Sequence, residues 1–169
     1  MATKWNLDPA HSEITFKVRH LMISNVKGEF TDFNVELESE DDQFKNVNAK
    51  AEIKTDSVNT KSADRDAHLR GEDFFNAEKF PTITFKTNKL NDEVTGELTI
   101  NGVTKPISLD VDFGGVNVDP WGNTKAGFSF DGKIKRSEFG LNWNAALEAG
   151  GVMVSDDVKI AGELQFVKA

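Results

Sequence analysis

Apolar and polar residues alternate with a period of two over most of this chain. The clearest case is the segment 13–19, in which Ile14, Phe16 and Val18 share one face and polar or charged residues occupy the other. Successive side chains of a β-strand point to opposite faces, so this pattern predicts a strand with one buried face. Similar segments follow at 47–53, 94–100, 107–113, 128–134 and 158–166. Roughly eight or more strands with short turns predict an all-β sandwich or barrel.

Turn signals separate these strands. Asn101-Gly102 predicts a two-residue hairpin turn with positive φ at both residues. Phe30 and Phe33 are three residues apart, which implies a β-bulge if both face the core. No linker, low-complexity segment or fixed-period repeat interrupts the pattern. We therefore expect a single domain over residues 1–169.

Residues 62–80 follow a helical pattern instead. Asp64 and His68 are four residues apart, as are Asp66 and Arg70, a spacing typical of neighbours on a helix. We expect Gly71 to end the helix by taking a positive φ. This short helical insertion is either a lid over a cavity or a crossover that caps the core.

Composition and charge narrow the function. The formal net charge is −8, which argues against binding to nucleic acids. The absence of cysteine excludes disulfides, thiolate metal sites and cysteine nucleophiles. No apolar run approaches the roughly 20 residues that a membrane span needs, and the N-terminal residues lack the apolar region of a signal peptide. We therefore expect a soluble cytoplasmic protein, or a periplasmic or secreted one if a leader segment has been removed.

The motifs that suggest catalysis are incomplete. Residues 127–133 resemble a phosphate-binding loop, but Ile134 stands where the magnesium-binding Ser or Thr belongs. His11, His20 and His68 lack the spacing of metal ligands. We therefore expect no catalytic residue, no metal site and no cofactor, and we do not expect an enzyme.

Small residues occupy several inward positions of the predicted strands, among them Gly96, Gly132 and Gly162. A glycine inside a strand marks a bend or a space. An eight-stranded barrel is about the size at which the interior is either filled or admits one ligand. We favour an apolar cavity over a filled core with glycines at the barrel corners.

The regular inward positions supply candidate lining residues for that cavity. They are Ile14, Phe16, Val18, His20, Phe30, Phe33, Ile83, Phe85, Leu98, Ile100, Leu109, Val111, Phe128 and Phe130, with Trp143 as a candidate at the mouth. The cationic residues Arg19, Arg65, His68 and Arg136 are candidates for holding an anionic head group. The alternative for Arg65 is an ion pair with a nearby carboxylate, which would fix the helical insertion.

Several motifs, taken together and in order, resemble the YceI-like proteins, which bind polyisoprenoids in a lipocalin-like β-barrel. They include Asp8-Pro-Ala-His11-Ser12, Arg65-Asp66-Ala-His68-Leu69, Phe80-Pro81-Thr82-Ile83 and Arg136-Ser-Glu-Phe139-Gly140. The resemblance spans nearly the whole chain. It implies an extended antiparallel barrel of roughly eight strands around a long apolar tunnel. It also implies a long-chain isoprenoid or fatty lipid as the partner.

We therefore expect non-catalytic binding, storage or transport of such a lipid. Whether two copies form a homodimer is left open. Two alternatives remain: an enzyme that acts on an isoprenoid-like lipid, and a filled barrel that serves as a protein-interaction module.

Overall fold

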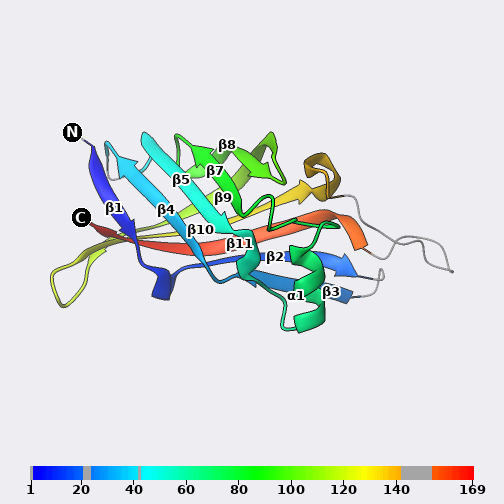
Figure 1. The fold of residues 1–169 in the computed structure, drawn as a ribbon. Coiled ribbons are helices and arrows are strands. Elements are labelled where there is room, and N and C mark those ends of the chain that lie inside the picture. The colour runs from blue at the N-terminus through cyan, green and yellow to red at the C-terminus, as the bar shows by residue number, and fades with distance from the viewer. Residues whose placement is uncertain (1, 21–23, 42, 142–153) are drawn as a thin grey trace.

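The chain forms a strongly curved antiparallel sheet with one α-helix at its side, as a computed structural model shows (Figure 1). The structure describes residues 2–20, 24–41, 43–141 and 154–169. Within these ranges the strands are β1 (Thr3–Leu7), β2 (Glu13–His20), β3 (Ser24–Phe30), β4 (Phe33–Ser39), β5 (Val47–Lys54), β6 (Val58–Asn59), β7 (Thr82–Thr87), β8 (Asp92–Ile100), β9 (Val103–Val118), β10 (Thr124–Lys135) and β11 (Val154–Lys168). The helix is α1 (Ala63–Arg70), and three short 3-10 helices are η1 (Pro9–His11), η2 (Thr55–Ser57) and η3 (Arg136–Phe139).

β11 closes the sheet into a barrel. Hydrogen-bonded neighbours follow the order β1, β4, β5, β7, β8, β9, β10 and β11, and β11 pairs again with β1. This closed ring confirms the predicted all-β barrel. β11 is long enough to pair with β1 at residues 166–168 and with β2 over its earlier part. Next to the earlier part of β11, the wall therefore continues through β2, β3 and β6.

Alternation places one face of each strand inside the barrel. In β4, Val35 and Leu37 are buried, whereas the alternating residues Asn34, Glu36 and Glu38 are exposed. The turn from β8 to β9 has φ of 54° at Asn101 and 75° at Gly102, which confirms the predicted hairpin.

Phe30 and Phe33 do not flank a bulge, contrary to the expectation from their spacing. The chain bends between them at Thr31 and Asp32, so β3 and β4 are separate strands. Neighbouring backbone groups hold this bend, because the Thr31 N–H donates to the Ser57 carbonyl over 3.1 Å. The Phe30–Phe33 pair thus marks a change of direction of the chain.

α1 confirms the helical insertion, although the α-helix covers only its first half and turns follow. The Ser62 hydroxyl caps the helix by accepting a hydrogen bond from the Arg65 N–H over 3.4 Å. The expected positive φ at Gly71 is wrong, because its φ is −81° and its N–H donates to the His68 carbonyl. The chain leaves α1 in an extended conformation, and the positive φ, 47°, falls later at Asn76.

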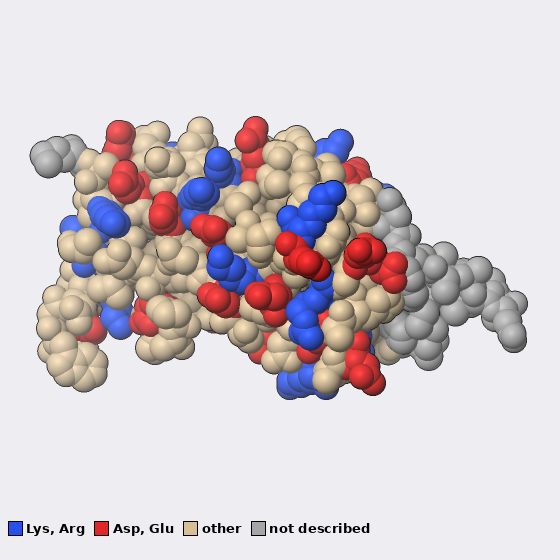
Figure 2. All heavy atoms as spheres, viewed as in Figure 1, with Lys and Arg blue, Asp and Glu red and all other residues tan. Residues whose placement is uncertain are grey.

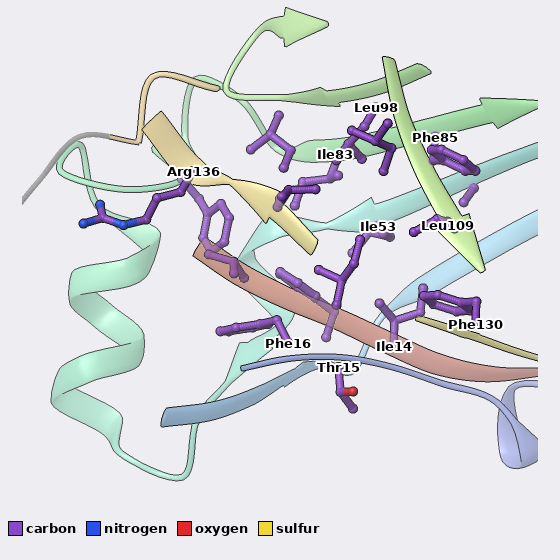
Figure 3. Close-up of a pocket in the computed structure, with 18 of the residues that line it drawn as sticks. Ile14, Thr15, Phe16, Ile53, Ile83, Phe85, Leu98, Leu109, Phe130 and Arg136 are labelled. Atoms are coloured by element: carbon purple, nitrogen blue, oxygen red, sulfur yellow. The ribbon is translucent and has the colours of Figure 1, made fainter. Parts of the chain in front are cut away.

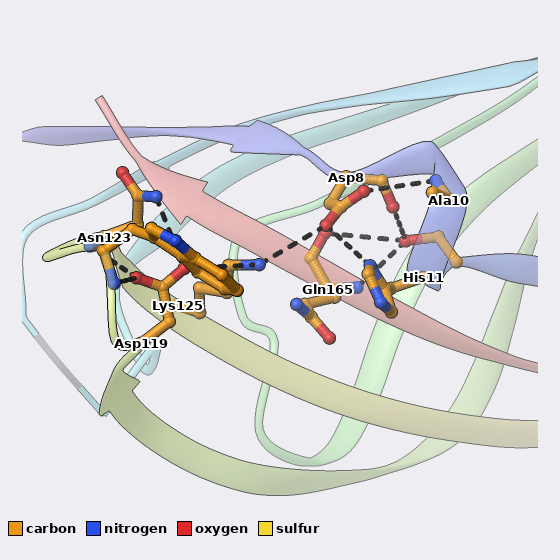
Figure 4. Close-up of polar contacts among 9 residues, drawn as sticks. Asp8, Ala10, His11, Asp119, Asn123, Lys125 and Gln165 are labelled. Atoms are coloured by element: carbon orange, nitrogen blue, oxygen red, sulfur yellow. Dashed lines mark hydrogen bonds and ion pairs between the residues drawn. The ribbon is translucent and has the colours of Figure 1, made fainter.

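The hairpin of β9 and β10 extends past the barrel and ends in a tightly bonded turn (Figures 1 and 4). The Asp119 carboxylate accepts hydrogen bonds from the N–H groups of Trp121 and Asn123, each over 2.9 Å. The Lys125 ammonium lies 3.7 Å from carboxylate oxygens of both Asp119 and Asp8. The turn is therefore tied to the chain beside β1, while the Trp121 side chain is 82% exposed.

Charged side chains of both signs cover the surface of the barrel. On the face seen in Figure 2, acidic and basic residues are interspersed over the strands. Among the described helices, none has the length and apolar character that crossing a membrane requires.

An apolar cavity as the candidate functional site

A cavity of about 500 Å³ lies inside the barrel. Its wall consists of inward side chains from the strands, and α1 and η3 contribute residues at one end (Figure 3). Ile14, Phe85, Leu98, Leu109 and Phe130 illustrate the apolar character of this wall. The volume falls within the roughly 300–1,000 Å³ typical of small-molecule sites. The barrel is therefore hollow rather than filled.

Most of the lining residues predicted from the alternation lie on this wall. They are Ile14, Phe16, Val18, Phe30, Ile83, Phe85, Leu98, Ile100, Leu109, Val111, Phe128 and Phe130. Phe33 does not line the cavity. It directly follows the bend between β3 and β4, and its ring packs against the surrounding core. The side chain of His20 and the whole of Trp143 lie outside the described residues.

Other lining residues were not predicted. The polar ones are Thr15, Asp64 and Thr87, and the apolar ones are Val26, Val35, Ala49, Ala51, Ile53, Leu69, Phe74, Phe75, Leu90, Val94, Ile107, Ile134, Leu141, Val154, Val158, Ile160 and Leu164. Those on strands mostly continue the same two-residue alternation, so a more complete application of that pattern would have found them. Leu69, Phe74 and Phe75 come from the helical insertion and the turns after it, where that pattern does not apply.

Gly96 and Gly162 are covered by phenylalanine rings and Gly132 by the Leu109 side chain, so these glycines are not the empty spaces that the sequence suggested. A β-carbon on Gly96 would lie 2.5 Å from Cζ of Phe85, and one on Gly162 would lie 2.6 Å from Cζ of Phe130. Because each ring packs back onto a glycine of the neighbouring strand, it stays close to the wall. The hollow is therefore the space that these rings do not enter.

One end of the cavity is closed by packed aromatic rings. The ring centroid of Phe44 lies 4.8 Å from that of Phe128, 5.2 Å from that of Phe113 and 5.3 Å from that of Trp5. Phe166 packs against Phe128 from the other side, at 5.8 Å. We call these five residues the aromatic plug. Phe128 lines the cavity, and Phe44 and Phe166 pack behind it fully buried, so the plug closes this end of the barrel.

The opposite end carries polar side chains from α1 and η3. Asp64, Arg65 and His68 line it from α1, and Arg136 lines it from η3. The Arg65 guanidinium donates to the Thr60 hydroxyl over 2.8 Å and to the Thr60 carbonyl over 2.7 Å. These bonds tie α1 to the segment before it, and the Arg65 guanidinium therefore binds Thr60 rather than a carboxylate. The sequence analysis did not predict the bonds between Arg65 and Thr60.

Arg136 holds η3 against the start of β11. Its guanidinium donates to the carbonyls of Ser155, Leu141 and Val154 over 2.9, 2.7 and 3.2 Å. Its side chain is buried, and this burial lowers its pKa, an effect that the nearby Asp156 carboxylate partly offsets. Arg136 therefore lines the cavity and also connects two segments of the backbone, whereas its role in holding a head group stays a prediction.

The remaining cationic candidates lie in different places. Arg19 does not line the cavity, because it follows the inward Val18 on β2 and its exposed side chain belongs to the outer face. The His68 imidazole lies at the α1 end, with Nε2 3.0 Å from the Asp73 carboxylate and its ring edge-on to Phe74. The described part of the chain contains no group of three or more side chains suited to hold a metal ion.

The match to known proteins covers nearly all of this architecture. The YceI-like domain family matches residues 5–166. The chain belongs to the YceI-like family. A UPF0312 protein of Staphylococcus epidermidis is 43% identical to this YceI-like chain over 166 residues, which is 97% of each chain.

Solved structures show the same fold. The crystal structure of a YceI protein of Campylobacter jejuni matches this YceI-like chain with a TM-score of 0.76 and 38% identity, over 89% of this chain and 90% of that one. A polyisoprenoid binding domain of Saccharophagus degradans matches with a TM-score of 0.72 over 98% of each chain. Its identity is 17%, so this second likeness shows a shared barrel fold.

Proposed function

We propose that this protein binds a long-chain apolar lipid, of the polyisoprenoid class or similar, in the barrel cavity and carries or stores it without chemical change. The observation that supports this most strongly is the shape of the cavity, an apolar channel that ends at the aromatic plug and reaches α1. Membership of the YceI-like family and the fold shared with a polyisoprenoid binding domain support the same ligand class.

The hydrophobic effect supplies the affinity for such a ligand. Burying a CH₂ group contributes about 0.8 kcal/mol, so one five-carbon isoprene unit contributes roughly 4 kcal/mol before costs. Ordering a flexible chain opposes this gain, which is why several buried units still give an ordinary affinity. Affinity should therefore depend on how much of the ligand fits between the plug and α1.

Selectivity should depend on length and width more than on the head group. At the α1 end, donors of Arg65 bind Thr60, and donors of Arg136 bind backbone carbonyls. A head group placed there would have to share these donors. We therefore expect lipids with similar tails and different head groups to bind with similar affinity.

Binding without catalysis is the interpretation that the polar side chains favour. His68 is paired with Asp73, an arrangement that orients an imidazole. A nucleophile within reach would be needed to turn this pair into a catalytic site. Among the described residues of the wall, the hydroxyl groups belong to Thr15 and Thr87, which lie on β2 and β7 rather than on α1. The Thr15 hydroxyl donates to the Ala161 carbonyl, and its side chain points away from the cavity in Figure 3.

The test is to identify what the protein carries. The protein is purified without detergent from the organism that encodes it, extracted with organic solvent and analysed by mass spectrometry. We expect one long-chain apolar molecule per chain. Leu98→Trp should remove it, because Leu98 lines the cavity and an indole would occupy the ligand's space.

Leu98→Met is the matched control, since it keeps the volume and apolar character of the side chain. It should retain the lipid at the native level. Extracts without any long-chain lipid, together with no uptake of an apolar fluorescent probe by the native protein, would contradict the proposal. Conversion of an added polyisoprenoid to a product would contradict the non-catalytic part.

A further inference from the structure

Four lysines stand side by side on the outer face of the barrel. In the register of the sheet, Lys133 faces Lys159, Lys159 faces Lys17, and Lys17 faces Lys27. They lie on four neighbouring strands, β10, β11, β2 and β3. We call these four residues the lysine row. Together with Lys61 they line one hollow of about 840 Å³ on the outside of the barrel.

The lysine row does not serve the stability of the sheet. Like charges directly opposite each other on neighbouring strands are destabilising. Lys133 lies 3.7 Å from the Asp157 carboxylate. Within the described part of the chain, no carboxylate forms an ion pair with Lys17, Lys27 or Lys159. Three adjacent ammonium groups therefore repel one another without an ion pair to offset the repulsion.

Another pair of facing lysines in the same barrel has oppositely charged neighbours. Lys50 and Lys86 also face each other, on β5 and β7. In that row Glu36 faces Lys50 from β4, and Glu97 faces Lys86 from β8. Opposite charges thus flank the lysine pair on both sides. The lysine row lacks such partners, although the whole chain carries 28 acidic and 20 basic residues.

The position of the lysine row relates it to the cavity. The next residue along each of its strands towards the α1 end points inward and lines the cavity, for example Val18 on β2 and Val158 on β11. The other side of the same hollow is acidic. Glu29 and Asp131 each lie two residues from a lysine of the row, in the direction away from the α1 end, and Asp110 faces Asp131. Positive charge on this outer face is therefore concentrated beside the polar end of the cavity.

We propose that the lysine row docks the barrel onto an anionic lipid bilayer, with its α1 end at the membrane surface. Ammonium groups on flexible stems suit lipid phosphates, and each basic residue near an anionic membrane strengthens binding about fivefold. The net charge of −8 opposes contact by any other face, so the row also fixes the orientation. Docking itself does not require a lipid in the cavity. The docking proposal rests on the proposed function only for the purpose that docking serves.

Vesicle sedimentation tests the proposal. The native protein is mixed at low ionic strength with vesicles of phosphatidylcholine alone, or of phosphatidylcholine with phosphatidylglycerol. We expect binding to the second kind only, and we expect added salt to weaken it because the charges are exposed. The double variant Lys17→Gln/Lys159→Gln should bind roughly twentyfold more weakly.

Lys50→Gln/Lys86→Gln is the matched control, because it removes the same charge from another facing lysine pair. It should bind vesicles like the native protein. An equal loss in both double variants, or no binding of the native protein to anionic vesicles, would overturn the proposal. Displacement by inorganic phosphate beyond that by chloride at equal ionic strength would also overturn it, since it would indicate a site for a free anion.

Two further readouts keep the result interpretable. Removing repulsion should leave Lys17→Gln/Lys159→Gln at least as stable as the native protein in urea, so loss of binding would not reflect unfolding. The lipid content of each variant is measured separately by mass spectrometry. Vesicle binding without any carried lipid would contradict the proposed function alone, and carried lipid without vesicle binding would contradict the docking proposal alone.

Discussion

The ring of Phe130 covers Gly162, its direct partner across the β10–β11 pair. A β-carbon on Gly162 would lie 2.6 Å from both Cε1 and Cζ of that ring, and the backbone oxygen of Glu13 also lies too close for a methyl group. The position therefore requires glycine because two strands and a ring approach it closely. The same arrangement recurs where Phe16 covers Gly28 and where Phe85 covers Gly96.

Gly162→Ala should destabilise the protein. The added methyl group forces a shift of the backbone or of Phe130, which costs about 1–3 kcal/mol in the free energy of unfolding. Urea unfolding measures this change. Gly127→Ala on β10 is the control, because a β-carbon there would meet no atom within 4 Å. Equal stability of the two variants would show that the close approach at Gly162 has been misjudged.

Gly28→Ala should narrow the cavity more than it harms the fold. The atoms nearest to a β-carbon at Gly28 all belong to the Phe16 ring, which can rotate away from the wall. Since Phe16 lines the cavity, its ring would then enter the ligand's space. We expect weaker uptake of an apolar fluorescent probe, with unfolding still cooperative. Probe uptake equal to that of the native protein would mean that the ring moves elsewhere.

Arg136→Lys should loosen the α1 end of the barrel. A lysine ammonium cannot reproduce the planar set of donors that reaches Ser155, Leu141 and Val154. Each buried carbonyl left without a partner costs about 1–3 kcal/mol. Arg65→Lys is the control, because the Arg65 side chain bonds to the single residue Thr60 and Arg65 is exposed. Thermal unfolding of the two variants should rank Arg136→Lys as clearly less stable, and the reverse order would refute the structural role of Arg136.

Stability should fall at acid pH in a way that depends on Asp119. Hydrogen bonds from Asn123 outweigh the effect of burial and, with Lys125, hold the pKa of Asp119 below its ordinary value of 3.8. A carboxyl group whose pKa is lower in the folded state stabilises the fold above the unfolded pKa, and it loses this contribution as the pH falls through the folded pKa. Urea unfolding is therefore measured from neutral pH to below 3.8. The free energy of unfolding should fall less on acidification in Asp119→Asn than in the native protein.

Asp112→Asn is the control for this measurement. Asp112 lies on β9, the strand that leads into that turn, and its carboxylate forms no hydrogen bond or ion pair with the described residues. Its variant should follow the native pH profile. A profile of Asp119→Asn that coincides with that of Asp112→Asn would exclude the Asp119 turn as the acid-sensitive element.

The strands and much of the cavity wall could be predicted because both follow from local alternation. Ile14, Phe16 and Val18 point inward for the same reason that Lys17 points outward. Phe33 shows the limit of this reasoning. Its spacing from Phe30 suggested a shared face, but the bend between β3 and β4 depends on bonds to η2 and β5. Sequence spacing contains no information on such contacts.

The aromatic plug is the clearest part that sequence reasoning missed. Phe44 lies in a polar turn between β4 and β5, has a φ of 60°, and is nevertheless fully buried. Its partners Trp5, Phe113 and Phe128 are far away in the sequence. Their meeting depends on closure of the barrel, which no local pattern encodes. The bonds of Arg65 to Thr60 were missed because a charged side chain on a helix has many equally acceptable partners.

The pairing of β1 with β11 has a consequence for how this protein folds during its synthesis on the ribosome. β1 comes first among the strands of the barrel, and the residues of β11 that pair with it, 166–168, follow all the other barrel strands in the chain. The barrel therefore stays open until β11 has been synthesised, with β1 and β10 both lacking the neighbour that β11 provides. Joining such distant segments carries a high entropic cost and is slow. During that interval the apolar inner surface is accessible to any hydrophobic molecule nearby, including another nascent chain.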